Sequence, residues 1–327
     1  MKERMGIRFS LLVATLLLSG CSRPAAVTLM PTLTPVPATA TASLTPTLTL
    51  TPEPSLTPTP TWVPQGPDHV QVPIFMYHHI AVSPSNSRYY VSPEKFEAQL
   101  KLLHDWEYRT ITTTMLIEAI TRGASLPARP IIITFDDANL DNYTNAFPIM
   151  QKYGYTGVLY VPYSYVGQPN FLSVDQIREM ASAGWEVGSH SLNHLTNFLA
   201  LEPAAMRREV VASRQLLEEL LQLPILTFAY PFGLNSGAAV DYVHFAGYTA
   251  GMGATGYTAD QGLGNLFVLQ RVEIRGSEDP KTITRFLPWH GDPAFLPPDT
   301  PTATLPPTRT PIPTYTQYPT KTSPPSP

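Results

Sequence analysis

The 327-residue chain contains a single cysteine, Cys21. One cysteine cannot form an intramolecular disulfide, and it excludes a metal site that is built from several cysteines. An excess of positive charge is also lacking, because the formal net charge is −4. Nucleic-acid binding needs a basic surface, so we expect no nucleic-acid partner for this protein.

Long hydrophobic runs are missing from the start of the chain as well. The apolar stretch at 9–18 follows three basic residues and is too short to span a bilayer comfortably. These features predict an export signal over residues 1–21. The sequence before Cys21 resembles the lipobox of bacterial lipoproteins, in which the cysteine is lipidated and becomes the mature N-terminus. We therefore expect an extracytoplasmic protein with a lipid anchor in the cell membrane; the alternative is an ordinary signal peptide.

Proline is abundant only toward the two ends. Of the 36 prolines, ten lie within 31–67 and twelve lie within 293–327. Proline fixes φ and lacks an amide hydrogen, so these Thr/Pro-rich stretches favour extended spacers over helices or central strands. We expect a linker over 22–67, one globular domain over 68–292 and a disordered tail over 293–327. The middle region is long enough for one well-buried core.

The middle region alternates short apolar runs with amphipathic segments. The runs predict strands at 72–77, 130–135, 157–161, 185–189 and 225–230, and another from Tyr248; the amphipathic segments predict helices after Ser92 and at 142–153, 173–183, 202–221 and 238–246. This alternation indicates an α/β fold with a parallel sheet or barrel wrapped by helices. In such folds, functional residues follow the carboxyl ends of the strands.

Polar clusters follow three of these strands. Asp136 and Asp137 end the second strand, His190 and His194 follow the fourth, and a Pro-Phe-Gly turn follows the fifth. Taken singly, the Asp pair is also typical of a helix cap, and the His pair of a solvated surface. Taken together at successive strand ends, one carboxylate and two imidazoles indicate a three-ligand metal site with open positions.

Three motifs carry a resemblance to a known family. Thr134–Asp137 (TFDD), His190–His194 (HSLNH) and Phe228–Gly233 (FAYPFG) are similar to motifs of the polysaccharide deacetylases, the NodB-homology or carbohydrate esterase family 4 group. The resemblance runs from about Pro73 to about Arg275. It implies a distorted (β/α) barrel and metal-dependent removal of N-acetyl or O-acetyl groups from sugars.

The resemblance also implies roles for individual residues. Asp137, His190 and His194 would hold a divalent metal, with zinc expected and cobalt, nickel or iron as alternatives. Asp136 would be the general base that activates a water molecule. The backbone N–H of Phe232 would stabilise the oxyanion, with Tyr230 beside it in the substrate region.

The third motif departs from the family pattern. Many members have an arginine where this chain has Ala229, and that arginine orients the base aspartate. Arg271 is our candidate for its replacement, with an ordinary ion pair elsewhere as the alternative. The family's usual D-x-x-D-W motif is also missing.

The general acid of the family is a histidine at the end of an apolar strand. His78, after the run at 74–77, fits this pattern and resembles the circularly permuted deacetylases of biofilm poly-N-acetylglucosamine systems. His79 and His290 are the alternatives, although a proline interrupts the run before His290. Adjacent strand residues point to opposite faces, so we expect only one of His78 and His79 to reach the site.

These inferences combine into one hypothesis with two rivals. The chain is expected to be a lipid-anchored hydrolase that removes N-acetyl groups from an N-acetylglucosamine-containing polysaccharide, with chitin-like oligomers, peptidoglycan and exopolysaccharide as possible substrates. The permuted layout favours exopolysaccharide. One rival is a non-catalytic carbohydrate-binding lipoprotein on a degenerate deacetylase fold. The other is a metal enzyme that hydrolyses a different amide or ester.

Overall fold

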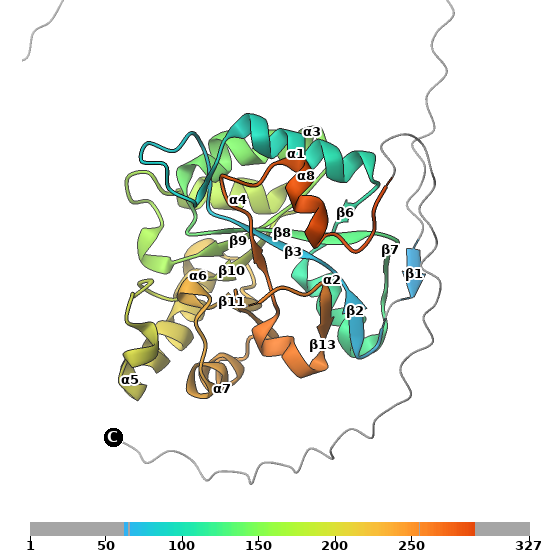
Figure 1. Ribbon diagram of the computed structural model, residues 1–327. Coiled ribbons are helices and arrows are strands. Elements are labelled where there is room, and N and C mark those ends of the chain that lie inside the picture. Colours follow the sequence, from blue (N-terminus) through green and yellow to red (C-terminus); the bar gives the residue numbers. More distant parts are fainter. Residues whose placement is uncertain (1–61, 65, 255, 292–327) are drawn as a thin grey trace, which may run out of the picture. The chain divides into compact units, whose positions relative to one another are not determined.

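The computed structural model describes residues 62–64, 66–254 and 256–291 (Figure 1). The predicted export signal, Cys21 and the C-terminal tail at 293–327 lie outside these residues, as does most of the linker at 22–67. Among the residues described, no helix is both long enough and apolar enough to cross a membrane.

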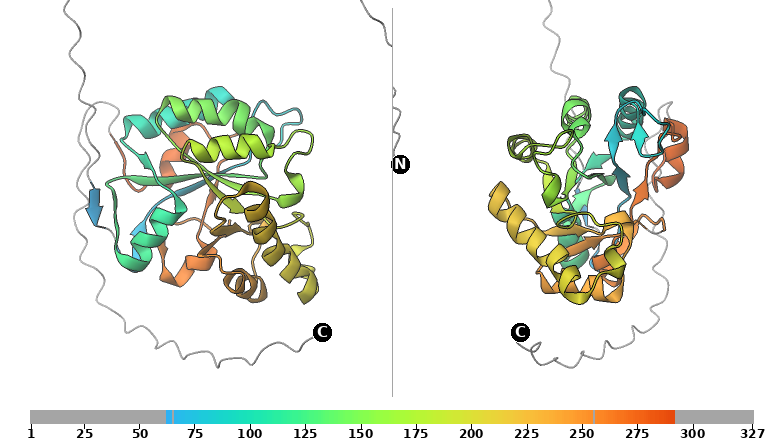
Figure 2. Two further views of the ribbon diagram at one scale, coloured as in Figure 1. Left: turned by 180° about the vertical axis from the view of Figure 1, so that it is seen from behind. Right: turned by 90° about the vertical axis from the view of Figure 1, so that its left-hand side faces the viewer.

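A parallel sheet of eight strands forms the centre of the fold (Figures 1 and 2). Seven strands follow the order β12-β11-β10-β9-β8-β3-β14, and β6 pairs with β8 beside this path. The prediction of an α/β fold with a parallel, barrel-like sheet is thereby confirmed. The strands are β3 (Ile74–Tyr77), β6 (Arg109–Thr110), β8 (Pro130–Asp136), β9 (Val158–Val161), β10 (Glu186–Ser189), β11 (Thr227–Ala229), β12 (Ala250–Met252) and β14 (Val272–Glu273).

Short two-stranded pairings lie outside the central sheet. They are β1 (Trp62–Pro64) with β7 (Ser125–Pro127), β2 (His69–Gln71) with β13 (Asp260–Gly262), and β4 (His79–Ile80) with β5 (Tyr90–Val91). The strand that was predicted at 72–77 corresponds to β3 and begins two residues later than expected, at Ile74.

Most of the helices cover one face of the sheet, whereas buried residues of α2 belong to the hydrophobic cluster on the other face (Figures 1 and 2). Their starts follow local capping chemistry: Ser92 accepts from the Lys95 amide, and Ser173 forms a reciprocal capping box with Gln176. The α-helices are α1 (Pro93–Asp105), α2 (Thr113–Arg122), α3 (Phe147–Lys152), α4 (Val174–Ser182), α5 (Pro203–Arg207), α6 (Ser213–Leu221), α7 (Gly237–Phe245) and α8 (Pro280–Ile283).

Two predicted helices differ from the structure in the same way. The segment at 202–221 is divided into α5, a π-helical turn (Arg208–Ala212) and α6. The segment at 142–153 begins with a π-helical turn (Asn142–Ala146) before α3. Such turns insert an extra residue and often occur at functional sites. The π-helical turn at Arg208–Ala212 carries the buried Glu209, which accepts hydrogen bonds from Asn193 in the HSLNH loop.

Residues of β8 alternate between two hydrophobic clusters. Ile131, Ile133 and Phe135 pack under the helices, whereas Ile132 belongs to the cluster on the other face. Side chains two residues apart share a face of a strand. Asp136 therefore projects from the same face as Ile132, away from α1, α3 and α4, and lies at the carboxyl end of the sheet.

Candidate active site

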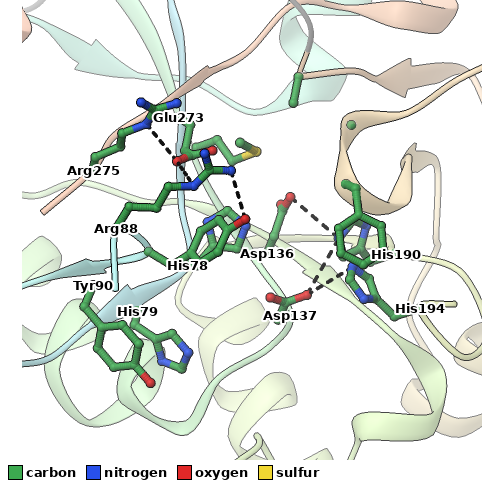
Figure 3. Close-up of a pocket in the computed structure, with 15 residues that line it drawn as sticks. His78, His79, Arg88, Tyr90, Asp136, Asp137, His190, His194, Glu273 and Arg275 are labelled. Carbon is green, nitrogen blue, oxygen red and sulfur yellow. Dashed lines mark hydrogen bonds and ion pairs between the residues drawn. The ribbon is translucent and has the colours of Figure 1, made fainter. Parts of the chain in front are cut away.

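A cavity of about 420 Å³ opens beyond the carboxyl ends of the strands (Figure 3). Both motif aspartates and both motif histidines line it, together with residues from the segments after β3 and β11 and from β14. The remaining lining residues are Met76, His78, His79, Arg88, Tyr89, Tyr90, Phe232, Gly233, Ala254, Glu273 and Arg275.

Asp137 and the two motif histidines surround one point. The Oδ1 atom of Asp137 lies 3.7 Å from Nε2 of His190 and 3.5 Å from Nε2 of His194. One ligand atom from each residue lies within 4.8 Å of the others. Tetrahedral zinc with bonds of about 2.0–2.2 Å needs its ligand atoms roughly 3.3–3.6 Å apart. The spacing therefore suits a single ion that is shared by the three side chains.

The backbone holds two of these side chains in sparsely populated conformations. Asp137 has φ 74° and His194 has φ 52°, both in the left-handed region. Non-glycine residues adopt this region seldom, and they do so mostly where surrounding contacts enforce it, often at functional sites. The His194 amide donates to Ser191 Oγ at 2.9 Å, which secures the turn between the histidines.

The protonation of His190 leaves one nitrogen available to a metal. Its Nδ1 lies 2.8 Å from the carbonyl oxygen of Ala229, which can only accept a hydrogen bond, so Nδ1 carries the proton. Burial lowers the pKa of His190 to about 3, and the ring is neutral at pH 7. Nε2 then presents its lone pair toward Asp137, as metal-ligating histidines do.

The surroundings of Asp137 disfavour the ionised form of its carboxyl group. Its Oδ1 is buried and has no hydrogen-bond partner among the described residues. Burial, and after it the neighbouring Asp136 carboxylate, raises the pKa of Asp137 to about 7. A cation held with the two imidazoles would compensate for both effects, and the O,N,N donor set suits divalent zinc. The residues present therefore fit a metal ion.

Asp136 has a different environment from its neighbour. Arg271 Nη1 donates to its Oδ1 at 2.6 Å, and Nη2 donates to its Oδ2 at 2.8 Å. Burial disfavours the carboxylate, but Arg271 and the nearby His190 outweigh it and lower the pKa of Asp136 to about 2. Asp136 is thus ionised at neutral pH, with Oδ2 3.7 Å from Nε2 of His190.

Arg271 is held firmly from several sides. Its side chain is 1% exposed, Nε donates to the Gly253 carbonyl at 3.0 Å, and Nη1 also donates to Thr134 Oγ1 at 3.2 Å. The guanidinium carbon lies 5.2 Å from the centre of the Tyr160 ring. Arg271, our candidate for the replacement arginine, therefore lies beside Asp136.

Both N-terminal histidines line the cavity. His78 Nδ1 is buried without a hydrogen-bond partner in the described part of the chain, and burial lowers the pKa of His78. His79 Nδ1 lies 2.7 Å from Asp141 Oδ2, and its ring stacks on Tyr90 at 4.0 Å. The expectation that only one of the pair would reach the site is wrong, because β3 ends at Tyr77 and the strand alternation stops there.

The turn after β11 brings Phe232 to the cavity but not the side chain of Tyr230. Phe232 has φ 57° and is 49% exposed, with its ring 4.7 Å from that of His194. Gly233 has φ 69°, and a Cβ there would lie 2.3 Å from the Cβ of Ala254, so the turn requires glycine. Tyr230 is fully buried, and its hydroxyl donates to the Phe267 carbonyl at 2.9 Å.

Other residues fall outside the sequence-based expectations. His290 does not line the cavity; its ring lies 5.5 Å from that of Trp106, and it is exposed. Sequence reasoning missed Glu209, which accepts from the Asn193 amide at 2.8 Å and from its side chain at 2.6 Å. It also missed Arg88, Glu273 and Arg275, which line the side of the cavity opposite His190 and His194 (Figure 3). No motif marks these four residues.

Part of the chain matches a known protein family. The family description "Polysaccharide deacetylase" matches residues 123–251, which include the TFDD, HSLNH and FAYPFG motifs. The chain contains a polysaccharide deacetylase domain. The resemblance to the NodB-homology family and the expected hydrolase class are thereby confirmed.

Two curated relatives are similar to the chain in sequence, and a solved structure shares its fold. YxkH of Bacillus subtilis, named as a polysaccharide deacetylase, is 29% identical over 204 residues, 62% of this chain and 71% of that protein. The poly-beta-1,6-N-acetyl-D-glucosamine N-deacetylase of Staphylococcus aureus is 28% identical over 176 residues, 50% of this chain and 60% of that protein. The Streptococcus pyogenes deacetylase PplD shares the fold, with a TM-score of 0.62 and 24% identity over 70% of this chain and 99% of that one.

Proposed function

We propose that this polysaccharide deacetylase is a metal-dependent enzyme that hydrolyses N-acetyl groups of an extracellular, N-acetylglucosamine-containing polysaccharide. One observation carries the proposal: an ionised carboxylate, Asp136, adjoins the triad of Asp137, His190 and His194. The name of the staphylococcal relative, a poly-beta-1,6-N-acetyl-D-glucosamine N-deacetylase, supports an N-acetylated glycan as the substrate.

Asp137, His190 and His194 are the proposed metal ligands. A divalent cation in this position, zinc by the donor set, supplies positive charge that acidifies water and polarises an acetyl carbonyl. The neutral His190 and the otherwise unpartnered Asp137 oxygen are suited to hold it. The Ala229 carbonyl orients the His190 ring.

Asp136 and His78 are the proposed base and acid. Arg271 keeps Asp136 ionised and fixes both of its oxygens, so Asp136 can accept a proton from the attacking water. His78 lies in the same cavity, and its lowered pKa makes the protonated ring a stronger donor to the departing sugar nitrogen. The Phe232 N–H, in the turn beside His194, is proposed to donate to the oxyanion.

The location of the enzyme is part of the proposal. A glycan outside the cell requires an exported enzyme, and the predicted signal and lipobox at Cys21 would anchor it to the membrane by lipid. A non-catalytic carbohydrate-binding role is disfavoured, because glycan binding does not require a buried ionised aspartate beside three metal-ligating side chains.

Acetate release tests this proposal directly. The full-length protein is incubated with N-acetylglucosamine oligomers, with and without a chelator, and compared with Asp136→Asn. We expect wild type to release acetate only without chelator, and the variant to retain bound metal while losing at least about 100-fold in turnover. Equal turnover in the two proteins would remove Asp136 from the mechanism, and no acetate from wild type would refute the proposed activity.

A further inference from the structure

A second cavity of about 440 Å³ adjoins the first one. The two cavities share Arg88 and Tyr90 in their walls. The second cavity is formed by the segment 81–95 and by Gly276 and Ser277. Its charged lining residues are Arg88 and Lys95, and no carboxylate lines it; four serines and Asn86 add polar groups.

Arg88 brings uncompensated positive charge to the junction of the two cavities. Its Nε lies 3.3 Å from Glu273 Oε1, and Arg275 Nε bonds the same oxygen at 3.0 Å. The single carboxylate of Glu273 thus pairs with the guanidinium groups of both Arg88 and Arg275. These three side chains together carry one net positive charge. Figure 3 shows Arg88, Glu273 and Arg275 across the cavity from His190 and His194. Arg88 is 54% exposed and remains accessible to a ligand.

Lys95 is fixed in the wall of the second cavity. Its ammonium donates to the Gly276 carbonyl, and the Gly276 amide donates to the Arg88 carbonyl at 3.0 Å. A Cβ at Gly276 would lie 2.4 Å from the Tyr90 carbonyl oxygen, so the close approach of these segments requires glycine. An ammonium has three hydrogens, and the two that Gly276 does not use remain for a ligand.

We propose that the substrate is an acidic glycan, in which a sugar next to the N-acetylated one carries a carboxylate or phosphate that binds between Arg88 and Lys95. This inference rests on the proposed deacetylase function and narrows its substrate class. A neutral N-acetylglucosamine polymer offers these cations no counter-charge, and its deacetylated units carry ammonium groups that they repel. An anionic group, in contrast, gains charge-assisted hydrogen bonds in a prepared site.

The test compares three oligomers of equal length. One contains only N-acetylglucosamine, one carries a lactyl-ether carboxylate on alternate sugars, and one carries a phosphate monoester there. Acetate release gives kcat/KM for each, and the acidic-to-neutral ratio is the measure of preference. The proteins are wild type, Arg88→Gln, Lys95→Gln and Lys95→Arg, with Lys101→Gln as the control on the same helix. Lys101 is 64% exposed and pairs with Asp105 instead.

We expect wild type to prefer at least one acidic oligomer by tenfold or more, and the preferred oligomer identifies carboxylate or phosphate. Arg88→Gln and Lys95→Gln should each reduce this ratio about tenfold, mainly through KM. Lys95→Arg keeps the positive charge and should therefore retain the wild-type ratio. The wild-type preference should also fall as salt rises.

Three outcomes overturn the inference. They are a wild-type ratio near one for both acidic oligomers, an unchanged ratio in both glutamine variants, and a loss in Lys101→Gln equal to that in Lys95→Gln. Acetate release from the neutral oligomer under those outcomes leaves the deacetylase function standing. No acetate from any oligomer would refute that function and this inference together.

Discussion

Arg271 donates to both carboxylate oxygens of Asp136, although the two residues are 135 positions apart in the chain. Asp136 ends β8, and Arg271 immediately precedes β14; the two strands lie on either side of β3. The contact forms on the sheet face that carries Thr134, which also bonds Arg271. One ion pair therefore links the start of β14, the last strand in the order of the sheet, to the proposed base Asp136.

Replacing Arg271 with methionine should impair both stability and activity. Removing one partner of a buried ion pair costs about 3–5 kcal/mol of unfolding free energy, because the other charge stays buried. The pKa of Asp136 should then rise above about 2, since burial is no longer outweighed. A base acts only when ionised, so the acid limb of the acetate-release profile should move to higher pH. Denaturant unfolding and a pH–rate profile check this prediction, with the exposed Arg122→Met as control. An unmoved acid limb would contradict it.

Replacing Asp137 with asparagine should have opposite effects on the metal-free and metal-loaded proteins. The pKa of Asp137 is raised to about 7, so the folded metal-free protein binds this proton more tightly than the unfolded chain does. Its stability therefore falls as pH rises from about 4 to about 7, by at most roughly 4 kcal/mol.

Thermal unfolding with chelator and with zinc checks the Asp137 prediction. Asp137→Asn lacks the ionisable group, so its melting temperature with chelator at pH 8 should exceed that of wild type. Wild type should gain melting temperature on addition of zinc, and the variant should gain little. A zinc shift of equal size in both proteins would exclude Asp137 as a ligand.

The two candidate acids should respond differently to substitution with alanine. His78 lines the cavity, so His78→Ala should lower turnover about 100-fold or more. His290 is exposed, and its Nε2 lies 3.1 Å from the Thr284 carbonyl outside that cavity, so His290→Ala should release acetate at the wild-type rate. Rates at saturating substrate distinguish the two. A larger loss in His290→Ala would refute the assignment.

Glu209 should control metal affinity without touching the metal. Its carboxylate accepts two hydrogen bonds from Asn193, between the proposed ligands His190 and His194. Glu209→Ala should release this loop and weaken zinc binding about 10- to 100-fold. Titration of zinc against a competing chelator measures the change, and the exposed Glu219→Ala is the control. Equal affinity in the two variants would show that the loop does not need this anchor.

Local patterns predicted much of the fold and the proposed ligands. The strand at 130–135 is a run of apolar residues, and all of β8 is buried. Ser92 and Ser173 cap helices where the capping pattern predicted them. The π-helical turns were not predictable in this way, because their amphipathic pattern differs little from that of a continuous helix. Glu209 accordingly gave no sign of its contact with Asn193.

The sequence by itself determined the alternating strands and helices, the Asp and His residues at the strand ends, and the family. Burial periodicity and short motifs act over a few residues, so they can be read along the chain. Only the tertiary structure decided that Arg271 pairs with Asp136, that His78 rather than His290 lines the cavity, and that Arg88 and Lys95 line a second cavity beside it. Those relationships depend on strand order and on loops that meet from distant parts of the chain, and no local pattern encodes them.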